Sequence, residues 1–252
     1  MPKLIATLTD FGVTGPYTGQ MHAAILQHSE QSLVVDLISD LPRFTPELSA
    51  YLIPRLADHF PVATVFVCVV DPGVGGSRQP LMVEADGKWY VGPDNGLLAL
   101  VVRRASQCRI RSITWRPKVL SNSFHGRDLF APVAAKIVDG ESVQGDSLTN
   151  TQIMGCGLPD DLPKIIYIDD FGNLVTGMRA AAVDEASVIV LENQRINAGL
   201  IFSECPPGDP FWYVNSMGLI EIAVNRGSAR ERFNAGLGDP IAITGPSRPD
   251  RA

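Results

Sequence analysis

The 252-residue sequence lacks several features that would define a class of protein. The N-terminus, "MPKLIATLTDFG", turns polar after a few residues, so we expect no secretory signal peptide. The longest apolar run, "PVATVFVCVV", is far shorter than the roughly 20 residues that a membrane-spanning helix needs. Basic residues are in the minority, with 21 Lys and Arg against 27 Asp and Glu. The resulting net charge of -6 argues against nucleic acid or an anionic membrane as the main partner.

Cysteine is scarce, and the spacings typical of metal and nucleotide sites are missing. The four cysteines (Cys68, Cys108, Cys156 and Cys205) are scattered and form no C-x-x-C pair, which predicts reduced thiols in a cytoplasmic protein and no structural zinc. There is no H-E-x-x-H or H-x-x-x-H spacing, no G-x-G-x-x-G, no G-K-[ST] and no G-x-S-x-G. We therefore expect no metal, no bound cofactor and no serine nucleophile.

The first part of the chain alternates strand-like and helix-like patterns up to about residue 140. Such alternation predicts a mostly parallel sheet covered by helices. The segment 81–92 reads instead as a hairpin, with Asp86 and Gly87 in the turn. Helix 45–60 is expected to bend at Pro54. Other strands are expected at 3–8, 32–38, 63–70 and 109–115, and other helices at 17–29, at 96–105 and after residue 128.

The composition changes in the segment 139–163, which is polar, contains Gly and Pro, and has no sustained period. We interpret it as a linker. The short strands expected after it are broken by Gly, Pro and Asn, which is typical of a small β-rich domain. The sequence thus predicts an N-terminal α/β domain at 1–150 and a C-terminal β domain at 163–252. The expected C-terminal strands are 164–169, 187–192, 211–214, 219–224 and 240–245.

Polar clusters follow several of the N-terminal elements. They are "TDFG" (9–12), "DPGVGGSR" (71–78), "GPDNG" (92–96) and "FHGRD" (124–128). In open α/β sheets, ligands bind outside the carboxyl ends of the strands, where such loops converge. Each cluster alone is better explained by a turn or a helix cap than by a binding site. Four together, with an arginine and a histidine among them and no covalent nucleophile, favour a pocket that activates a water molecule.

The motifs "LTDFG…GPYTG", "DPGVG…R", "GPDNG", "FHGRD" and "IDDFGN" occur here in an order that resembles the S-adenosyl-L-methionine (SAM) hydroxide adenosyltransferases. These SAM hydrolases are related to the fluorinase and the chlorinase. The resemblance covers nearly the whole chain. It implies an α/β fold, with an N-terminal mostly parallel α/β sandwich domain and a small C-terminal β-barrel domain. It also implies a homotrimer with composite active sites between neighbouring subunits.

The resemblance also implies roles for individual residues. Asp71, Arg78 and His125 would handle the water, and Asp10 would bind the ribose hydroxyls. Asn173 would read the adenine edge. The position of Arg127 and Asp128 at the start of a helix predicts a structural role for them instead, as an ion pair or a cap. The full set implied to contact SAM is Asp10, Phe44, Asn95, Phe124, Gly126, Asp169, Phe171, Asn173, Ser216, Glu221 and Val224. Asp170 is the alternative to Asp169, and Gly15 stands where the halogenases carry an acidic residue.

The reaction implied by the resemblance is hydrolysis of SAM at its 5′ carbon, giving adenosine and L-methionine. Attack by hydroxide on a sulfonium destroys charge, which a dry, partly aromatic pocket assists. In this mechanism His125 shares the water's proton, Asp71 orients the ring, and Arg78 stabilises the anion. Two alternatives stay open: halide transfer, against which the charge of Asp71 argues, and a non-catalytic sensor that binds adenosine or SAM.

Overall fold

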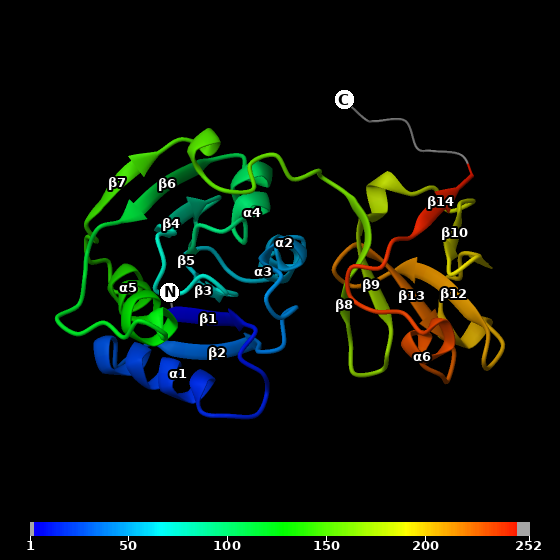
Figure 1. Cartoon of the computed structure of the whole chain (residues 1–252), viewed down its shortest axis with the longest axis horizontal. Helices are drawn as coiled ribbons and strands as arrows, with labels where there is room; N and C mark the ends of the chain where they lie inside the picture. The colour runs from blue at the N-terminus through cyan, green and yellow to red at the C-terminus, as the bar shows by residue number, and fades with distance from the viewer. Residues whose placement is uncertain (1–2, 246–252) are drawn as a thin grey trace. The chain divides into compact units, whose positions relative to one another are not determined.

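A computed structural model of the chain describes residues 3–245 and divides into two compact units, Met1–Leu158 and Pro159–Ala252 (Figure 1). The first unit contains a seven-stranded sheet of order β2-β1-β3-β5-β4-β6-β7. Strands β2, β1, β3 and β5 pair in parallel, and β5, β4, β6 and β7 pair antiparallel. The strands are β1 (Leu4–Thr9), β2 (Leu33–Ile38), β3 (Val65–Val69), β4 (Pro80–Ala85), β5 (Lys88–Pro93), β6 (Cys108–Ile113) and β7 (Gly145–Leu148).

Helices cover the sheet because its central strands are apolar on both faces. Every residue of β3 is buried. Because successive side chains of a strand point to opposite faces, this is possible only where both faces of the sheet are covered. On one face, Met21 and Val133 join a core cluster with Ile5 and Val67. On the other, Phe66 stacks on Tyr90 and meets Phe60 edge to face. The helices are α1 (Tyr17–His28), α2 (Pro46–Ser49), α3 (Ile53–Ala57), α4 (Ala99–Arg104) and α5 (Ala131–Val138), the last preceded by a π-helical turn η1 (Gly126–Phe130).

The hairpin predicted at 81–92 is confirmed as β4 and β5, whose turn places Asp86 and Gly87 at positive φ. The single bent helix predicted at 45–60 is wrong, because Pro54 lies in the first turn of a new helix, α3, where its missing N–H costs nothing. The linker predicted at 139–163 is wrong in part, since β7 within it pairs with β6. Gly145 permits this pairing: a Cβ there would lie 2.2 Å from the Ser112 carbonyl oxygen.

The second unit contains two antiparallel sheets, β12-β13-β9-β8 and β11-β10-β14. Its own core includes Ile165, Leu174, Trp212, Ile222 and Phe233. These two sheets by themselves do not confirm the barrel that the resemblance implies. The elements are β8 (Leu162–Ile168), β9 (Leu174–Arg179), β10 (Val188–Leu191), β11 (Gln194–Ile196), β12 (Pro210–Val214), β13 (Leu219–Val224), α6 (Ala229–Phe233) and β14 (Ala242–Thr244), with 3-10 turns at Ala180–Ala182 and Phe202–Glu204. A further 3-10 turn, Asn150–Gln152, belongs to the first unit.

No helix of residues 3–245 combines the length and the apolar character needed to span a membrane. The apolar runs of the sequence predicted strands at β8, β10, β12, β13 and β14, and the structure confirms them. The sequence did not predict β9 or β11. Gly177 interrupts the apolar run of β9, although that strand lies in the middle of its sheet.

Gly92→Ala provides a test of the parallel sheet. A Cβ at Gly92 would lie 2.4 Å from the Cys68 carbonyl oxygen, so β5 would have to move away from β3. We expect a loss of about 1–3 kcal/mol in the free energy of unfolding, the usual cost of overpacking. The measurement is urea denaturation, with Gly157→Ala as the control because nothing lies within 4 Å of that position. Equal stability of the two variants would contradict the close approach of β3 and β5.

Candidate active site

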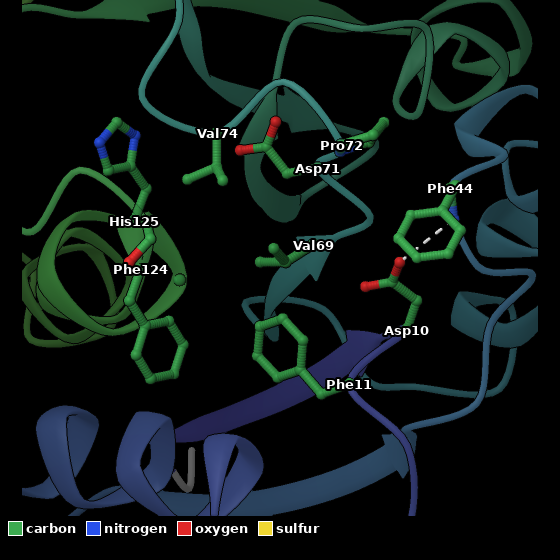
Figure 2. A pocket seen from close by; sticks show the side chains of 11 residues that line it. Asp10, Phe11, Phe44, Val69, Asp71, Pro72, Val74, Phe124 and His125 are labelled. Atoms are coloured by element: carbon green, nitrogen blue, oxygen red, sulfur yellow. Dashed lines mark hydrogen bonds between the residues drawn. The ribbon is translucent and has the colours of Figure 1, made fainter.

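A pocket of about 160 Å³ lies at the carboxyl ends of β1 and β3 in the first unit. The two strands are parallel neighbours, with Thr9 opposite Val69, so the residues that follow them emerge at the same edge. Asp10 and Asp71 are those residues, and Figure 2 shows both carboxylates at the same hollow as His125. The complete lining is Asp10, Phe11, Phe44, Val69, Asp71, Pro72, Val74, Ser123, Phe124, His125 and Gly126.

Asp71, Arg78 and His125 form a continuous chain of hydrogen bonds. The Arg78 guanidinium grips both carboxylate oxygens of Asp71, with Nε at 3.1 Å from Oδ1 and 3.0 Å from Oδ2, while Nη2 contacts Oδ2 as well. The same Nη2 lies 2.8 Å from Nδ1 of His125. Arg78 itself does not line the pocket. The expected contact of Asp71 with the imidazole is therefore corrected: the guanidinium stands between them and links the two.

The partner of Nδ1 determines the protonation of the His125 ring. A guanidinium has only donors, so Nδ1 must accept, and the neutral ring carries its proton on Nε2. Burial lowers the pKa of His125, and the nearby charge of Arg78 lowers it further. A proton on Nδ1 would face an N–H of Arg78, so the ring resists protonation there. In this state Nε2 of His125 is a hydrogen-bond donor, and Nδ1 is already used as an acceptor by Arg78.

The start of the helix after His125 is shaped by close packing. A Cβ on Gly126 would lie 3.1 Å from the Phe11 ring, so glycine lets this ring come close to the backbone. Phe124 meets the rings of both Phe11 and Tyr17 edge to face, with centroids 5.7 and 5.4 Å away. The rings of Phe11 and Phe124 give the pocket an apolar wall beside His125 (Figure 2).

The structural role predicted for Arg127 and Asp128 is confirmed by their contacts. The Arg127 guanidinium donates to both carboxylate oxygens of Asp128, and its carbon lies 4.9 Å from the centre of the Phe124 ring. Asp128 also accepts from the backbone N–H of Ser121. These hydrogen bonds hold the pKa of Asp128 below its ordinary value, so the carboxylate stays charged and fixes the loop before His125.

Asp10 is a carboxylate that burial makes easier to protonate. Desolvation raises its pKa, although the backbone N–H of Phe44 donates to Oδ2 at 3.4 Å and Arg43 lies near. Phe44 has a φ of 61°, unusual for a residue with a side chain, and its ring is 73% exposed (Figure 2). An exposed aromatic ring beside a half-buried carboxylate suits the binding of a flat, hydroxyl-bearing ligand.

Asn95 does not line either of the pockets described here. Its Nδ2 donates to the Val70 carbonyl oxygen at 2.8 Å, and its Oδ1 accepts from the backbone N–H of Leu97. The loop "GPDNG" thus supports the backbone that leads to Asp71. The sequence grouped it with the pocket loops because its residue types alone could not separate contact with a ligand from contact with backbone.

A second hollow, of about 890 Å³, belongs to the second unit alone. All the C-terminal residues named from the sequence line it: Asp169, Phe171, Asn173, Ser216, Glu221 and Val224. Asp170, the alternative to Asp169, does not. Sequence reasoning missed Tyr167, Tyr213, Asn215 and Arg226, which also line this hollow, and Phe11, Val69 and Val74 in the first pocket. Phe11 follows Asp10 in the sequence and Asn215 precedes Ser216, so their position beside predicted site residues could have indicated that they line the hollows.

Internal hydrogen bonds pre-order this second hollow. Asp169 accepts from the backbone N–H groups of Phe171 and Asn173 and from the side-chain amide of Asn173. That last bond leaves the Asn173 carbonyl oxygen available to a ligand donor. Glu221 is buried and accepts from the Tyr213 hydroxyl and the Asn215 amide, so both of its oxygens are occupied. Burial and the Glu221 hydrogen bond raise the pKa of Tyr213.

The fold and the two hollows define a class: a two-unit α/β protein with an Asp–Arg–His chain at one pocket and an aromatic, amide-bearing hollow in the other unit. Residues 5–145 match the SAM hydroxide adenosyltransferase N-terminal domain, and residues 163–242 match the C-terminal domain of the same family. The chain therefore belongs to the SAM hydroxide adenosyltransferase family, a family of enzymes.

Relatives span nearly the whole chain. An (R)-S-adenosyl-L-methionine hydrolase of Thermus thermophilus is 34% identical over 94% of this chain and 97% of its own. One from Methanocaldococcus jannaschii is 31% identical, with 95% of each chain covered. A fluorinase of Actinopolyspora mzabensis is 24% identical over 96% of this chain and 97% of its own. A solved structure of an uncharacterised conserved protein from Thermotoga maritima superposes with a TM-score of 0.84 at 28% identity, covering 95% of this chain and 99% of that one.

The tautomer of His125 can be tested by nitrogen NMR of the histidine side chains. We expect a neutral ring at pH 7 with its proton on Nε2, and a pKa below the ordinary value of about 6.5. Arg78→Met should raise this pKa, because it removes a positive charge and leaves the Asp71 carboxylate without its partner. The other three histidines serve as internal references. A proton on Nδ1 at pH 7, or a pKa unmoved by Arg78→Met, would contradict this assignment.

Proposed function

We propose that the protein hydrolyses S-adenosyl-L-methionine at the 5′ carbon, producing adenosine and L-methionine. The observation that carries the proposal is the Asp71–Arg78–His125 chain beside an aromatic pocket in a member of this family. The hydroxide oxygen forms a bond to the 5′ carbon while the bond from that carbon to sulfur breaks. The electron pair of the broken bond stays on sulfur, so the leaving methionine is a neutral thioether.

The pocket favours this step through its polarity. Hydroxide and sulfonium carry opposite charges that disappear as the new bond forms, so a medium that solvates charge poorly lowers the barrier. The rings of Phe11, Phe44 and Phe124, with Val69 and Val74, supply such a medium. The leaving group is already activated by its positive charge, so the proposed reaction uses no cofactor. SAM itself acts as a substrate and not as a cofactor.

His125 and Arg78 hold the nucleophile in this mechanism. The Nε2–H of His125 donates to the oxygen of the bound water or hydroxide, which fixes its position and favours the charged form. Arg78 keeps the ring in this tautomer, and Asp71 keeps Arg78 in place. The water loses one proton to solvent before attack, so hydroxide is the species that forms the new bond. The rate should rise with pH because hydroxide becomes more available.

Substrate binding is divided between the two hollows in this proposal. Asp10 accepts from the two ribose hydroxyls, and Phe44 and Phe124 contact the nucleoside and the sulfonium region. Asn173 reads the adenine edge, with Asp169, Phe171, Ser216, Glu221 and Val224 completing the adenosine site. The N-terminal pocket, at about 160 Å³, is smaller than the roughly 300–1,000 Å³ typical of a pocket for a small molecule. It suits only part of SAM.

We propose a homotrimer in which the N-terminal pocket of one subunit meets the C-terminal hollow of the next. The two proposed domains are 1–150 and 163–252, and the second closes as a small β-barrel. The incomplete N-terminal pocket supports a composite site. The cytoplasm is the proposed location, since all four cysteines are free and disulfides are rare in reducing compartments.

Product analysis tests the reaction. Incubation of the protein with SAM should yield adenosine and methionine, and water enriched in heavy oxygen should label the 5′ hydroxyl of adenosine. His125→Ala should slow turnover by roughly 100-fold, the usual scale for losing a group that handles the reacting proton or water, while SAM affinity changes little. Label in methionine, or full activity of His125→Ala, would contradict the mechanism.

The controls for this assay separate the alternatives. Since the relatives are named for the (R) form of SAM, both epimers at sulfur are assayed separately. Parallel incubations with chloride or fluoride detect a halogenated nucleoside, which would support halide transfer instead. Binding of SAM by calorimetry without any product would identify a sensor.

Asp10→Ala should weaken SAM binding, measured by calorimetry, by about 2–4 kcal/mol, because two buried hydrogen bonds to the ribose hydroxyls are lost. Unchanged affinity would show that Asp10 is only a turn residue.

Mixed assemblies test the composite site. Asp71→Asn disables the N-terminal pocket and Asn173→Ala the C-terminal hollow, so each variant alone should be nearly inactive. When the two variants are unfolded and refolded together, some sites should combine two intact halves, and part of the activity should return. Light scattering on a sizing column gives the number of subunits. A fully active monomer, or no activity in the mixture although both variants assemble, would contradict the proposal.

A further inference from the structure

The loop "GPDNG" lies against the end of β3 without lining the pocket. Two of its residues contact consecutive parts of the backbone that lead to Asp71. Gly92 brings the end of β5 so close to Cys68 that no side chain fits between them. Asn95 then donates to the Val70 carbonyl at 2.8 Å. The loop therefore fixes the backbone of β3 at the point where it leaves the sheet and enters the pocket.

The Asn95 hydrogen bond acts on one peptide unit. The Val70 carbonyl belongs to the peptide plane that also contains the Asp71 nitrogen, and the plane is rigid. Holding its oxygen fixes the direction in which the Asp71 Cβ points. Asn95 is itself fixed, because its Oδ1 accepts from the Leu97 backbone N–H at 3.3 Å. Its amide is thus oriented with the donor towards Val70 and the acceptor towards Leu97.

The direction of the Asp71 side chain matters because Arg78 binds both of its carboxylate oxygens. The two-point grip of Arg78 on Asp71 requires the carboxylate and the guanidinium to be nearly coplanar. The side chains of this pair are only 4% and 9% exposed, so water cannot replace a lost contact. A rotated Asp71 would release Arg78, and Arg78 would then leave Nδ1 of His125.

We propose that Asn95 is a positioning residue, which holds the Val70–Asp71 peptide so that Asp71 and Arg78 can set the His125 ring. This inference rests on the proposed hydrolysis for its kinetic consequence and replaces the substrate contact expected for Asn95 from the sequence. Asn95 acts through the backbone and contacts no part of the substrate. A similar side chain that cannot donate to Val70 does not perform this role.

The test compares Asn95→Ala with the wild-type protein by two measurements. Turnover of SAM should fall by about tenfold or more, while SAM affinity stays within about threefold of the wild-type value. The reason is that the Asn95 amide orients the Asp71–Arg78–His125 chain and does not bind the substrate. By nitrogen NMR, the pKa of His125 should rise towards its ordinary value, because Arg78 no longer stands at Nδ1. This second measurement needs no substrate. It therefore tests the inference even if the wild-type protein proves inactive on SAM.

Asp94→Ala is the matched control, because Asp94 lies in the same loop but accepts from the backbone N–H of Met154. It removes an anchor of the loop without touching Val70, and it should leave turnover and the His125 pKa close to wild type. Asn95→Asp is a second variant, which keeps the acceptor for Leu97 but puts a charged oxygen in place of the donor to Val70; its turnover should fall as well.

Three results would overturn the inference. The first is Asn95→Ala with wild-type turnover and an unmoved His125 pKa. The second is an equal loss of turnover in Asn95→Ala and Asp94→Ala with no change in the His125 pKa, which would indicate that only the loop has loosened. The third is a loss of SAM affinity larger than the loss of turnover, which would indicate that Asn95 contacts the substrate.

Discussion

The candidate active site depends on the pairing of Arg78 with Asp71. Both side chains are almost fully buried, and their pairing lets two charges persist where water is excluded. Removing one partner of such a pair costs about 3–5 kcal/mol, because the other charge is left uncompensated. The pair also decides the chemistry next to it. Since Arg78 can only donate, it fixes one tautomer of His125, in which Nδ1 accepts from Arg78 and Nε2 carries the proton.

The glycines of "DPGVGGSR" serve this pairing through close packing. A Cβ on Gly75 would lie 2.3 Å from the Asn122 carbonyl oxygen, and the residue has a φ of 77°. Glycine therefore lets the turn after Asp71 pack directly on the segment that leads to His125. The turn is closed by the Val74 N–H, which donates to the Asp71 carbonyl at 3.2 Å. A glycine-rich loop after a strand thus brings two segments of the candidate active site together here.

The sequence predicted the features that depend on local pattern. The parallel strands β1 and β3 were predictable from their apolar runs, and with them the meeting of Asp10 and Asp71 at one sheet edge. Strand β7 was not, because its four residues are half-exposed and its pairing depends on the close approach of Gly145 to Ser112. The position of Arg78 between Asp71 and His125 was also beyond reach, since it depends on how two loops 47 residues apart pack.

The same geometry changes the argument about which nucleophile the pocket accepts. From the sequence, the charge of Asp71 argues against a halide by repulsion. In the structure that charge is paired with Arg78, so the field of Asp71 at the pocket is largely cancelled. In the proposed mechanism, selection of hydroxide then comes from the hydrogen bond that His125 donates and from the space beside it. In that mechanism hydroxide is formed in place from a water bound to His125, whereas a halide must first lose its own hydration shell to enter an apolar pocket.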